Sequence, residues 1–330
     1  MKFAVLQFFS WPERRVDLAT VYARALERIE IMDRAGYDAV WLAEHHFSSF
    51  SVCPSVHMVG TLAAARTRRL RIGTGVSLAP FYHPLRLAEE VALLDVLSGG
   101  RVNWGAGRGF ARVEFEAFGV PPEESTARFR ETVEIVLRAW SDERLHFAGE
   151  HFRFDGVEVL PKPTQRPHPP VWMAASSDGA LDWAAGRGFS ILMDPHSSAA
   201  EIGRKRRRYA EKLAAAGFPD AGRDIPVARL VALARNAEAA AAVARGGAEW
   251  IVNSYLGAQH RPVMHASFTP DDVDPVRHYV DEVILHGTPD AVVDQILRLR
   301  EEIGLDYLLC APLSHESFLL LTDEVLPRLG

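Results

Sequence analysis

The chain has 330 residues, of which 48% are hydrophobic and 24% are charged, and its formal net charge is −6. This balance is typical of a globular protein without a basic surface, so it disfavours nucleic acid and acidic lipid as partners and favours a small molecule. The sequence predicts neither a secretory leader nor a membrane-spanning segment, and we expect a cytoplasmic protein. The two cysteines, Cys53 and Cys310, are far apart in the sequence, which predicts reduced thiols rather than a disulfide framework or a structural metal site.

Apolar runs of strand length alternate with amphipathic stretches of helix length. Strands are predicted at residues 2–8, 39–42, 70–76, 102–106, 171–174, 190–193, 227–234 and 307–310. Helices are predicted at residues 18–32, 85–97, 126–140, 199–216 and 291–303. Eight alternations indicate an α/β protein whose parallel sheet closes into a (β/α)8 TIM barrel, in a single domain over residues 1–330. A doubly wound open sheet has the same periodicity and remains an alternative.

Two segments interrupt this alternation. Residues 144–156 alternate polar and apolar side chains around a glycine, which predicts a hairpin inserted outside the barrel. Residues 256–275 are polar, rich in proline and follow the seventh predicted strand. Since barrel active sites open at that end of the strands, we expect a lid there, although a surface or dimer-interface loop would have the same composition.

The second predicted strand ends in a carboxylate and two imidazoles, Glu44, His45 and His46. A position at the carboxyl end of a barrel strand favours a catalytic role. Because neighbouring strand residues face opposite ways, only one of the two histidines can point into a given pocket, and the other is expected to be structural. The sequence has neither a His-x-His nor a His-Glu-x-x-His pattern, so we expect no metal site.

Two segments have the properties of an anion site. The glycine-rich run 105–109 fails the dinucleotide pattern because Phe110 replaces its third glycine, but Arg108 can grip a phosphate. After the fifth predicted strand, a helix is expected to begin near Ala180, with Ser176 and Ser177 at its N-terminus. Each segment alone reads as a surface turn or a helix cap. Together they can hold one phosphate monoester.

The ordered series of these motifs resembles the bacterial luciferase-like flavin monooxygenases over nearly the whole chain. The motifs that carry the resemblance are Glu44-His45-His46-Phe47, Ile72-Gly73-Thr74-Gly75-Val76 followed by His83-Pro84, Leu93-Leu94-Asp95 with Ser98-Gly99-Gly100-Arg101, the run 105–109, and the stretch 171–185 ending in Asp182-Trp183-Ala184-Ala185. The resemblance implies a TIM barrel that binds reduced FMN, supplied by a separate flavin reductase. It also implies that O2 is activated as a flavin C4a-peroxide or hydroperoxide, that a small organic substrate is oxygenated, and that the chain forms a homodimer.

The resemblance also implies roles for particular residues. His45 corresponds to the family's catalytic histidine, and Glu44 would orient or tune it. The cofactor site corresponds to a non-proline cis peptide between Gly75 and Val76, to Gly107, and to phosphate ligands. Those ligands are Arg108 and Ser177, together with backbone amides of the stretch Ser176, Ser177, Asp178, Gly179 and Ala180.

One departure is that Gly107 stands where the luciferase catalytic subunit has a reactive cysteine, and we expect it to leave room beside the flavin ring. Two alternatives remain open: an F420-dependent hydride-transfer oxidoreductase of the same superfamily, and a non-catalytic flavin-binding subunit. The substrate is not identified by the sequence. Scattered aromatic residues such as Phe8, Phe50 and Trp250 could line an apolar cavity or serve in core packing.

Overall fold

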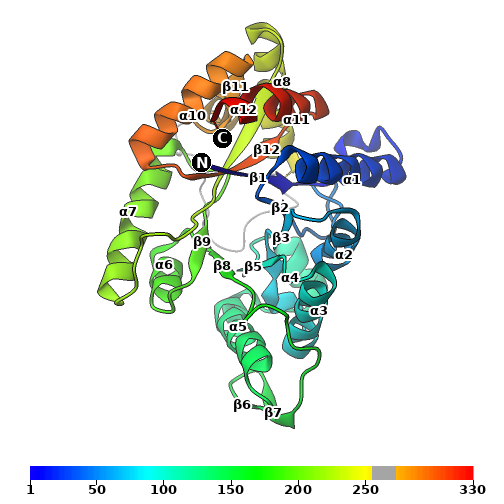
Figure 1. The fold of residues 1–330 in the computed structure, drawn as a ribbon, viewed down its shortest axis with the longest axis vertical. Helices are drawn as coiled ribbons and strands as arrows, with labels where there is room; N and C mark the ends of the chain where they lie inside the picture. The colour runs from blue at the N-terminus through cyan, green and yellow to red at the C-terminus, as the bar shows by residue number, and fades with distance from the viewer. Residues whose placement is uncertain (255–272, 330) are drawn as a thin grey trace.

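The computed structural model describes residues 1–254 and 273–329, with parallel strands at the centre and helices around them (Figure 1). Eight strands run side by side in the order β10 (Val227–Leu233), β12 (Tyr307–Pro312), β1 (Lys2–Gln7), β2 (Ala39–Leu42), β3 (Arg71–Thr74), β5 (Val102–Gly107), β8 (Val171–Ala174) and β9 (Ser190–Leu192). These are the eight predicted strands, in their predicted sequence order. Two short strands join the sheet, β4 (Ser77–Leu78) beside β5 and β11 (Leu285–Gly287) beside β10.

The ring closes between its first and last strands, β10 and β9. A single parallel bridge joins Met193 to Val227. The Met193 amide donates to the Pro226 carbonyl oxygen at 3.1 Å, and the Ala228 amide donates to the Met193 carbonyl oxygen at 3.2 Å. The predicted closed barrel is therefore confirmed, and the open doubly wound sheet is not formed.

The strands bury both of their faces. Along β1, Ala4 and Leu6 belong to one hydrophobic cluster and Val5 to another, as expected when alternate residues point inward and outward. The inner cluster also contains Trp41 and Trp172, whose rings meet edge to face with centroids 5.2 Å apart. Large side chains thus fill the barrel, leaving its rim for ligands.

Twelve α-helices lie within the described chain. They are α1 (Leu18–Ala35), α2 (Val56–Arg66), α3 (Pro84–Ser98), α4 (Arg112–Phe118), α5 (Ser125–Ser141), α6 (Asp178–Ala185), α7 (Ala199–Ala215), α8 (Ala237–Ser254), α9 (Pro275–His278), α10 (Pro289–Ile303), α11 (His315–Leu320) and α12 (Leu326–Leu329). Single 3₁₀ turns occur at Pro12–Arg14, Ala79–Phe81 and Pro122–Glu124, and π-helical turns at Tyr279–Val283 and Leu321–Val325. No helix in this part of the chain combines the length and apolarity needed to cross a membrane.

The sequence analysis missed α2. This helix buries Val56 and Ala63 on one side, yet exposes Met58 and Leu62 on the other. Apolar residues on both faces conceal the one-sided periodicity that identifies an amphipathic helix. Packing in the barrel core therefore does not account for the apolar side chains of Met58 and Leu62.

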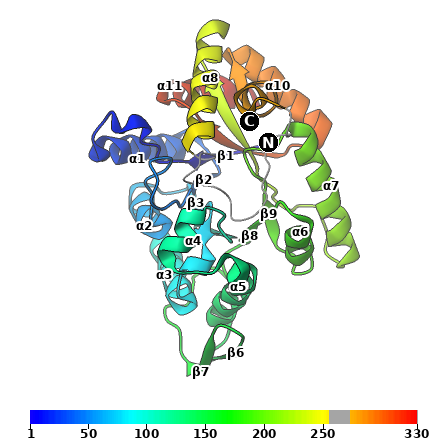
Figure 2. The ribbon, with the colours of Figure 1, turned by 180° about the vertical axis from the view of Figure 1, so that it is seen from behind.

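The segment expected to form a hairpin does so. Strands β6 (Leu145–Ala148) and β7 (Arg153–Val157) pair antiparallel and form a two-stranded sheet of their own. Both views place them at the end of the molecule farthest from the two termini, below α5 (Figures 1 and 2). The hairpin is thus an excursion from the barrel, while the segments that follow the parallel strands share one rim.

Candidate active site

Residues that follow β2 reach the rim of the barrel with their side chains in two different environments. The His45 ring stacks on Phe8, with centroids 6.2 Å apart, and meets Phe50 edge to face at 5.2 Å. The His46 ring instead lies beside Phe118, at 4.8 Å. The predicted separation of the two imidazoles is therefore present, with His45 on the side of the inner aromatic residues.

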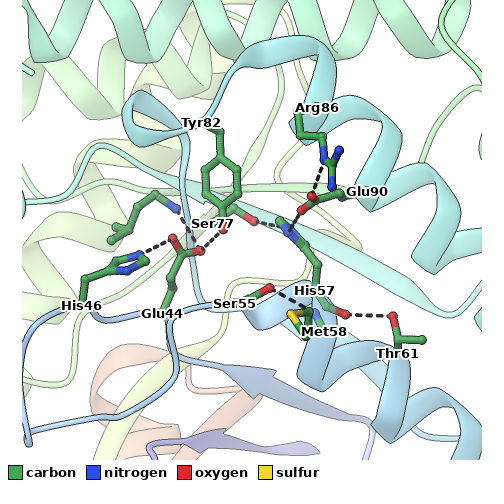
Figure 3. A network of polar contacts seen from close by, with 11 residues as sticks. Glu44, His46, Ser55, His57, Met58, Thr61, Ser77, Tyr82, Arg86 and Glu90 are labelled. Atoms are coloured by element: carbon green, nitrogen blue, oxygen red, sulfur yellow. Dashed lines mark hydrogen bonds and ion pairs between the residues drawn. The ribbon is translucent and has the colours of Figure 1, made fainter. Parts of the chain in front are cut away.

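Glu44 is 2% exposed, and hydrogen bonds reach both of its carboxylate oxygens (Figure 3). Its Oε1 lies 3.0 Å from His46 Nε2. Its Oε2 accepts from the Tyr82 hydroxyl at 2.9 Å and from the Leu78 amide at 3.4 Å. A buried carboxylate needs such donors to offset its lost hydration. These bonds show that Glu44 orients His46, and the predicted action of Glu44 on His45 stays a prediction.

A second buried carboxylate, Glu114 of α4, lies behind this pair. Its Oε1 accepts the backbone N–H of His46 at 3.1 Å. Burial raises the pKa of Glu114 to about 7, although that hydrogen bond acts in the opposite direction. A carboxyl group that titrates near neutrality beside the Glu44–His46 pair can take up or release a proton there.

A second polar network adjoins the first through Tyr82. The His57 ring of α2 meets the Tyr82 ring edge to face at 5.6 Å, and its Nε2 lies 3.1 Å from Ser77 Oγ. Its Nδ1 lies 3.1 Å from Glu90 Oε2, and this hydrogen bond holds the pKa of Glu90 down to about 2. Sequence reasoning missed His57, and it named Tyr82 only among the aromatic residues that could line an apolar cavity. The only signal was that Tyr82 precedes the His83-Pro84 motif.

The glycines of β5 allow neighbouring strands to approach very closely. A Cβ atom on Gly105 would lie 2.0 Å from the Thr74 carbonyl oxygen, and one on Gly107 would lie 2.4 Å from Val76 Cγ2. Val76 follows a cis peptide bond from Gly75, the bond that the family resemblance implies. A side chain at position 107 would meet the Val76 methyl group, and the expectation that Gly107 leaves room beside the flavin ring stays a prediction.

The two halves of the predicted phosphate site lie at the ends of adjacent strands. Strands β5 and β8 pair with Ala106 opposite Met173, so Arg108 and Ser177 follow neighbouring strand ends. Arg108 is half-buried, and burial lowers its pKa. Ser177 is the N-cap of α6, and its Oγ accepts the Ala180 amide at 3.4 Å. The helix-cap interpretation is therefore correct, and the N-terminus of α6 follows the strand that pairs with the one before Arg108.

Both basic and acidic side chains of α7 lie near α6, and the acidic ones are Glu201 and Glu211. A surface recess at this place is lined by Ser176, Asp178, Arg204, Arg207 and Arg208, among others. The Asp178 carboxylate, which would repel a phosphate, is paired with Arg208 at 2.7 Å. The sequence analysis did not assign these cations to the site, and the basic run at 204–208 was the available signal.

A larger cavity of about 600 Å³ opens on the other side of the rim, between α1 and α8. Phe8 and Phe50, the two rings that contact His45, form part of its wall. His196, which follows β9, also lines it, and its Nδ1 lies 2.8 Å from the Tyr279 hydroxyl. Burial lowers the pKa of His196 to about 4, so its imidazole is neutral at pH 7. His196 was not identified from the sequence.

The structure thus brings Glu44, Gly75, Gly107 and Arg108, with their neighbours, to the rim, at the ends of β2, β3 and β5. The predicted lid at 256–275 lies outside the described residues except for its last three positions, which lead into α9. Within residues 1–254 and 273–329, no group of three or more His, Cys, Asp or Glu side chains is placed to hold a metal ion.

Residues 1–307 match the family model described as luciferase-like monooxygenase, and the chain belongs to this family. An uncharacterized protein of Sinorhizobium fredii, y4wF, is 32% identical over 95% of this chain and 93% of its own length. The oxygenase component of the flavin-dependent trigonelline monooxygenase of Acinetobacter baylyi is 33% identical, but over only 53% of this chain and 49% of its own length.

Solved structures show the same fold. The monooxygenase RslO1 of Streptomyces bottropensis matches with a TM-score of 0.86 and 30% identity, over 100% of both chains. The oxygenating constituent of 3,6-diketocamphane monooxygenase from Pseudomonas putida matches with a TM-score of 0.80 and 20% identity, over 100% of this chain and 99% of that one. An F420-dependent tetrahydromethanopterin reductase of Methanopyrus kandleri matches with a TM-score of 0.75 and 19% identity, over the same shares.

Proposed function

We propose that this chain is the oxygenase component of an FMN-dependent monooxygenase, which receives reduced FMN from a separate reductase and oxygenates a small organic substrate with O2. The observation that carries the proposal is that half-buried Arg108 and the N-terminus of α6 follow adjacent strands, at the same rim of the barrel as His45. Two matched proteins support it by name. One is the oxygenase component of a flavin-dependent monooxygenase, and another was solved in complex with FMN.

The residues present fit FMN. Arg108 and the backbone amides at the start of α6 are donors suited to a phosphate monoester. Gly107 adds no side chain of its own, and the Val76 methyl group packs against it, which suits a flat ring lying on this surface. When bound, reduced FMN would supply the electrons with which O2 is activated.

The protein's own groups would then position the substrate and manage protons. His45, held by Phe8 and Phe50, is the group we assign to proton transfer, because an imidazole titrates near neutrality. Glu44 fixes His46 and Tyr82, and thereby the loop that presents His45. The surrounding aromatic rings would keep water from the reacting centre.

A second candidate is F420-dependent hydride transfer, since F420-dependent enzymes share this fold. Anaerobic titration of the protein with reduced FMN and with reduced F420 distinguishes the two. We expect the tighter binding for reduced FMN, followed by O2 consumption on mixing with aerated buffer. Tighter binding of reduced F420 would overturn the proposal. Binding of FMN without any O2 consumption would instead indicate a non-catalytic flavin-binding subunit.

Arg108→Ala tests the phosphate site within the same titration. We expect FMN affinity to fall by roughly ten-fold to a hundred-fold, which corresponds to about 1.5 to 3 kcal/mol for a lost charge-assisted contact. Riboflavin, which lacks the phosphate, should bind equally to both proteins. Arg112→Ala, which removes a charge from the exposed surface of α4, is the matched control. Unchanged FMN affinity in Arg108→Ala would remove this residue from the site.

A further inference from the structure

The cavity between α1 and α8 has the size of a small-molecule site. Its volume of about 600 Å³ lies within the usual range for organic ligands. Its inner wall comes from the ends of β1, β10 and β12, and its outer wall from the two helices. It lies on the opposite side of His45 from Arg108 in strand order, so it is separate from the predicted phosphate site.

The inner end of the cavity is apolar and aromatic. Phe8 and Phe50 meet edge to face there, with centroids 5.2 Å apart, and Leu230 and Trp250 contribute further apolar surface. The indole Nε1 of Trp250 and the Oε1 of Gln7 are buried and have no hydrogen-bond partner among the described residues. Both atoms are covered by protein and do not face the cavity, so this end presents an apolar surface to a ligand.

The outer end of the cavity is positively charged. Arg24 and Arg28 of α1 both line it, together with His315. The Arg28 Nε donates to His315 Nδ1 at 3.3 Å, and its guanidinium lies over the Phe318 ring, 5.4 Å from the centroid. No aspartate or glutamate occurs among the described residues that line this cavity, although the chain as a whole carries a net charge of −6.

The cationic groups at the outer end of the cavity repel one another. Arg24 and Arg28 are four residues apart on α1, and like charges at this spacing destabilise a helix. The pKa of Arg28 is lowered to about 10, first by burial and then by Arg24, with Glu27 acting in the opposite direction. Burial, followed by Arg28, also lowers the pKa of His315. A negative charge between these groups would relieve the repulsion.

We propose that this cavity binds an organic anion, with its carboxylate at Arg24 and Arg28 and its aromatic or hydrophobic body against Phe8, Phe50 and Trp250. This assignment rests on the proposed function in one respect: the anion is the substrate that the enzyme oxygenates. The body of the ligand would then lie beside the two rings that hold His45.

The test measures binding without flavin, by isothermal titration calorimetry with 3-phenylpropionate and with its neutral counterpart 3-phenylpropanamide. We expect the carboxylate to bind at least ten-fold more tightly than the amide at low ionic strength. Arg28→Gln should bring the two affinities to within about two-fold. Arg34→Gln, which removes a charge from the exposed end of the same helix, should leave the preference unchanged.

Equal affinity for acid and amide in the wild type would overturn the proposal, as would no binding of either or a preference that Arg28→Gln retains. Arg24→Gln provides a second variant if Arg28→Gln fails to fold. Because no flavin is present, this result is independent of the FMN titration. Tight carboxylate binding in a protein that does not bind FMN would retain the anion site and reject the proposed function.

Discussion

At the scale of single residues, burial decides which ionisable groups can take part in chemistry near pH 7. Burial raises the pKa of the Glu114 carboxyl group toward neutrality, whereas the hydrogen bond from His57 lowers the pKa of Glu90 and keeps it ionised. Burial and the neighbouring Glu44 carboxylate raise the pKa of Tyr82, so its hydroxyl remains a donor to Glu44. These differences arise from the fold and not from residue type.

His45→Ala should lower turnover by roughly 10² to 10⁴ if the imidazole performs acid or base catalysis. The fold should be retained, because the ring makes aromatic contacts rather than supporting a core strand. Steady-state product formation from a carboxylate substrate found in the binding series is the measurement. His46→Ala is the comparison, and it should lose stability through its bond to Glu44. Wild-type turnover in His45→Ala would contradict the assigned role.

Glu114→Gln should change how stability depends on pH. The folded-state pKa of about 7 lies above the ordinary value of 4.5, so the wild type loses stability as pH rises from about 4.5 to about 7. This displacement corresponds to about 3 kcal/mol. Glutamine can still accept a hydrogen bond from the His46 amide but does not ionise. The stability of the variant should therefore rise relative to that of the wild type as pH increases from about 4.5 to about 7.

Urea denaturation at pH 5 and pH 7.5 measures this difference. Glu116→Gln, on the exposed side of the same helix, is the control and should follow the wild type at both values. An equal stability difference between Glu114→Gln and wild type at the two pH values would show that the Glu114 carboxyl group is not perturbed.

At the scale of elements, glycines determine how closely β5 packs against the strand before it. A Cβ atom added at position 105 would meet the backbone, at the Thr74 carbonyl oxygen. A Cβ atom added at position 107 would meet the Val76 side chain. The Val76 side chain can move to accommodate a substitution at position 107, whereas the backbone of Thr74 cannot move to accommodate one at position 105. At the rim of the barrel, β5 therefore lies directly against the residues that follow β3.

Gly107→Ala should destabilise the protein by about 1 to 3 kcal/mol through overpacking against Val76. Adding Val76→Ala removes the opposing methyl group and should recover most of the loss, which a double-mutant cycle detects. Val76→Ala should not rescue Gly105→Ala, since the obstacle there is a carbonyl oxygen. Gly246→Ala, which meets no atom within 4 Å in α8, should be neutral or stabilising. Additive effects at 107 and 76 would contradict this account.

At the scale of the whole molecule, five of the twelve large apolar side chains exposed in the described residues lie on α2 and α3, two helices that pack against each other. Met58 and Leu62 of α2 are one turn apart, as are Leu93 and Leu97 of α3. Figure 1 shows α2 and α3 side by side on the outside of the barrel. Exposed apolar side chains on neighbouring helices are typical of an interface, so we expect the homodimer that the family resemblance implies to form across this surface.

We therefore expect Leu97→Asp to weaken self-association at least a hundred-fold, because it places an unpaired charge within that interface. Sedimentation velocity near 10 µM, a concentration chosen on the order of common micromolar affinities, should show a dimer for wild type and a monomer for the variant. Leu297→Asp, at an exposed leucine of α10, is the matched control and should remain dimeric. A monomeric wild type would reject the dimer, and a dimeric Leu97→Asp would place its interface elsewhere.

Local pattern alone was sufficient for the strands and for much of the rim, whereas the bridge between Met193 and Val227 decided that the sheet closes into a barrel rather than staying open. The eight strands, the capped helix that begins at Pro289, and the strand-end position of Glu44, His45 and His46 follow from periodicity and cap chemistry, which depend on residues close in sequence. Arg108 and Ser177 were linked because consecutive parallel strands end at the same edge.

Only the tertiary structure decided which distant side chains meet. Glu44 binds Tyr82, His57 reaches Glu90, and Arg28 meets His315 across the chain, through contacts that no local spacing encodes. It also showed that Val76 occupies the space beside Gly107. Periodicity specifies which face of an element is buried, whereas partners, cavities and pKa values depend on how separate elements pack, and that packing is a property of the whole chain.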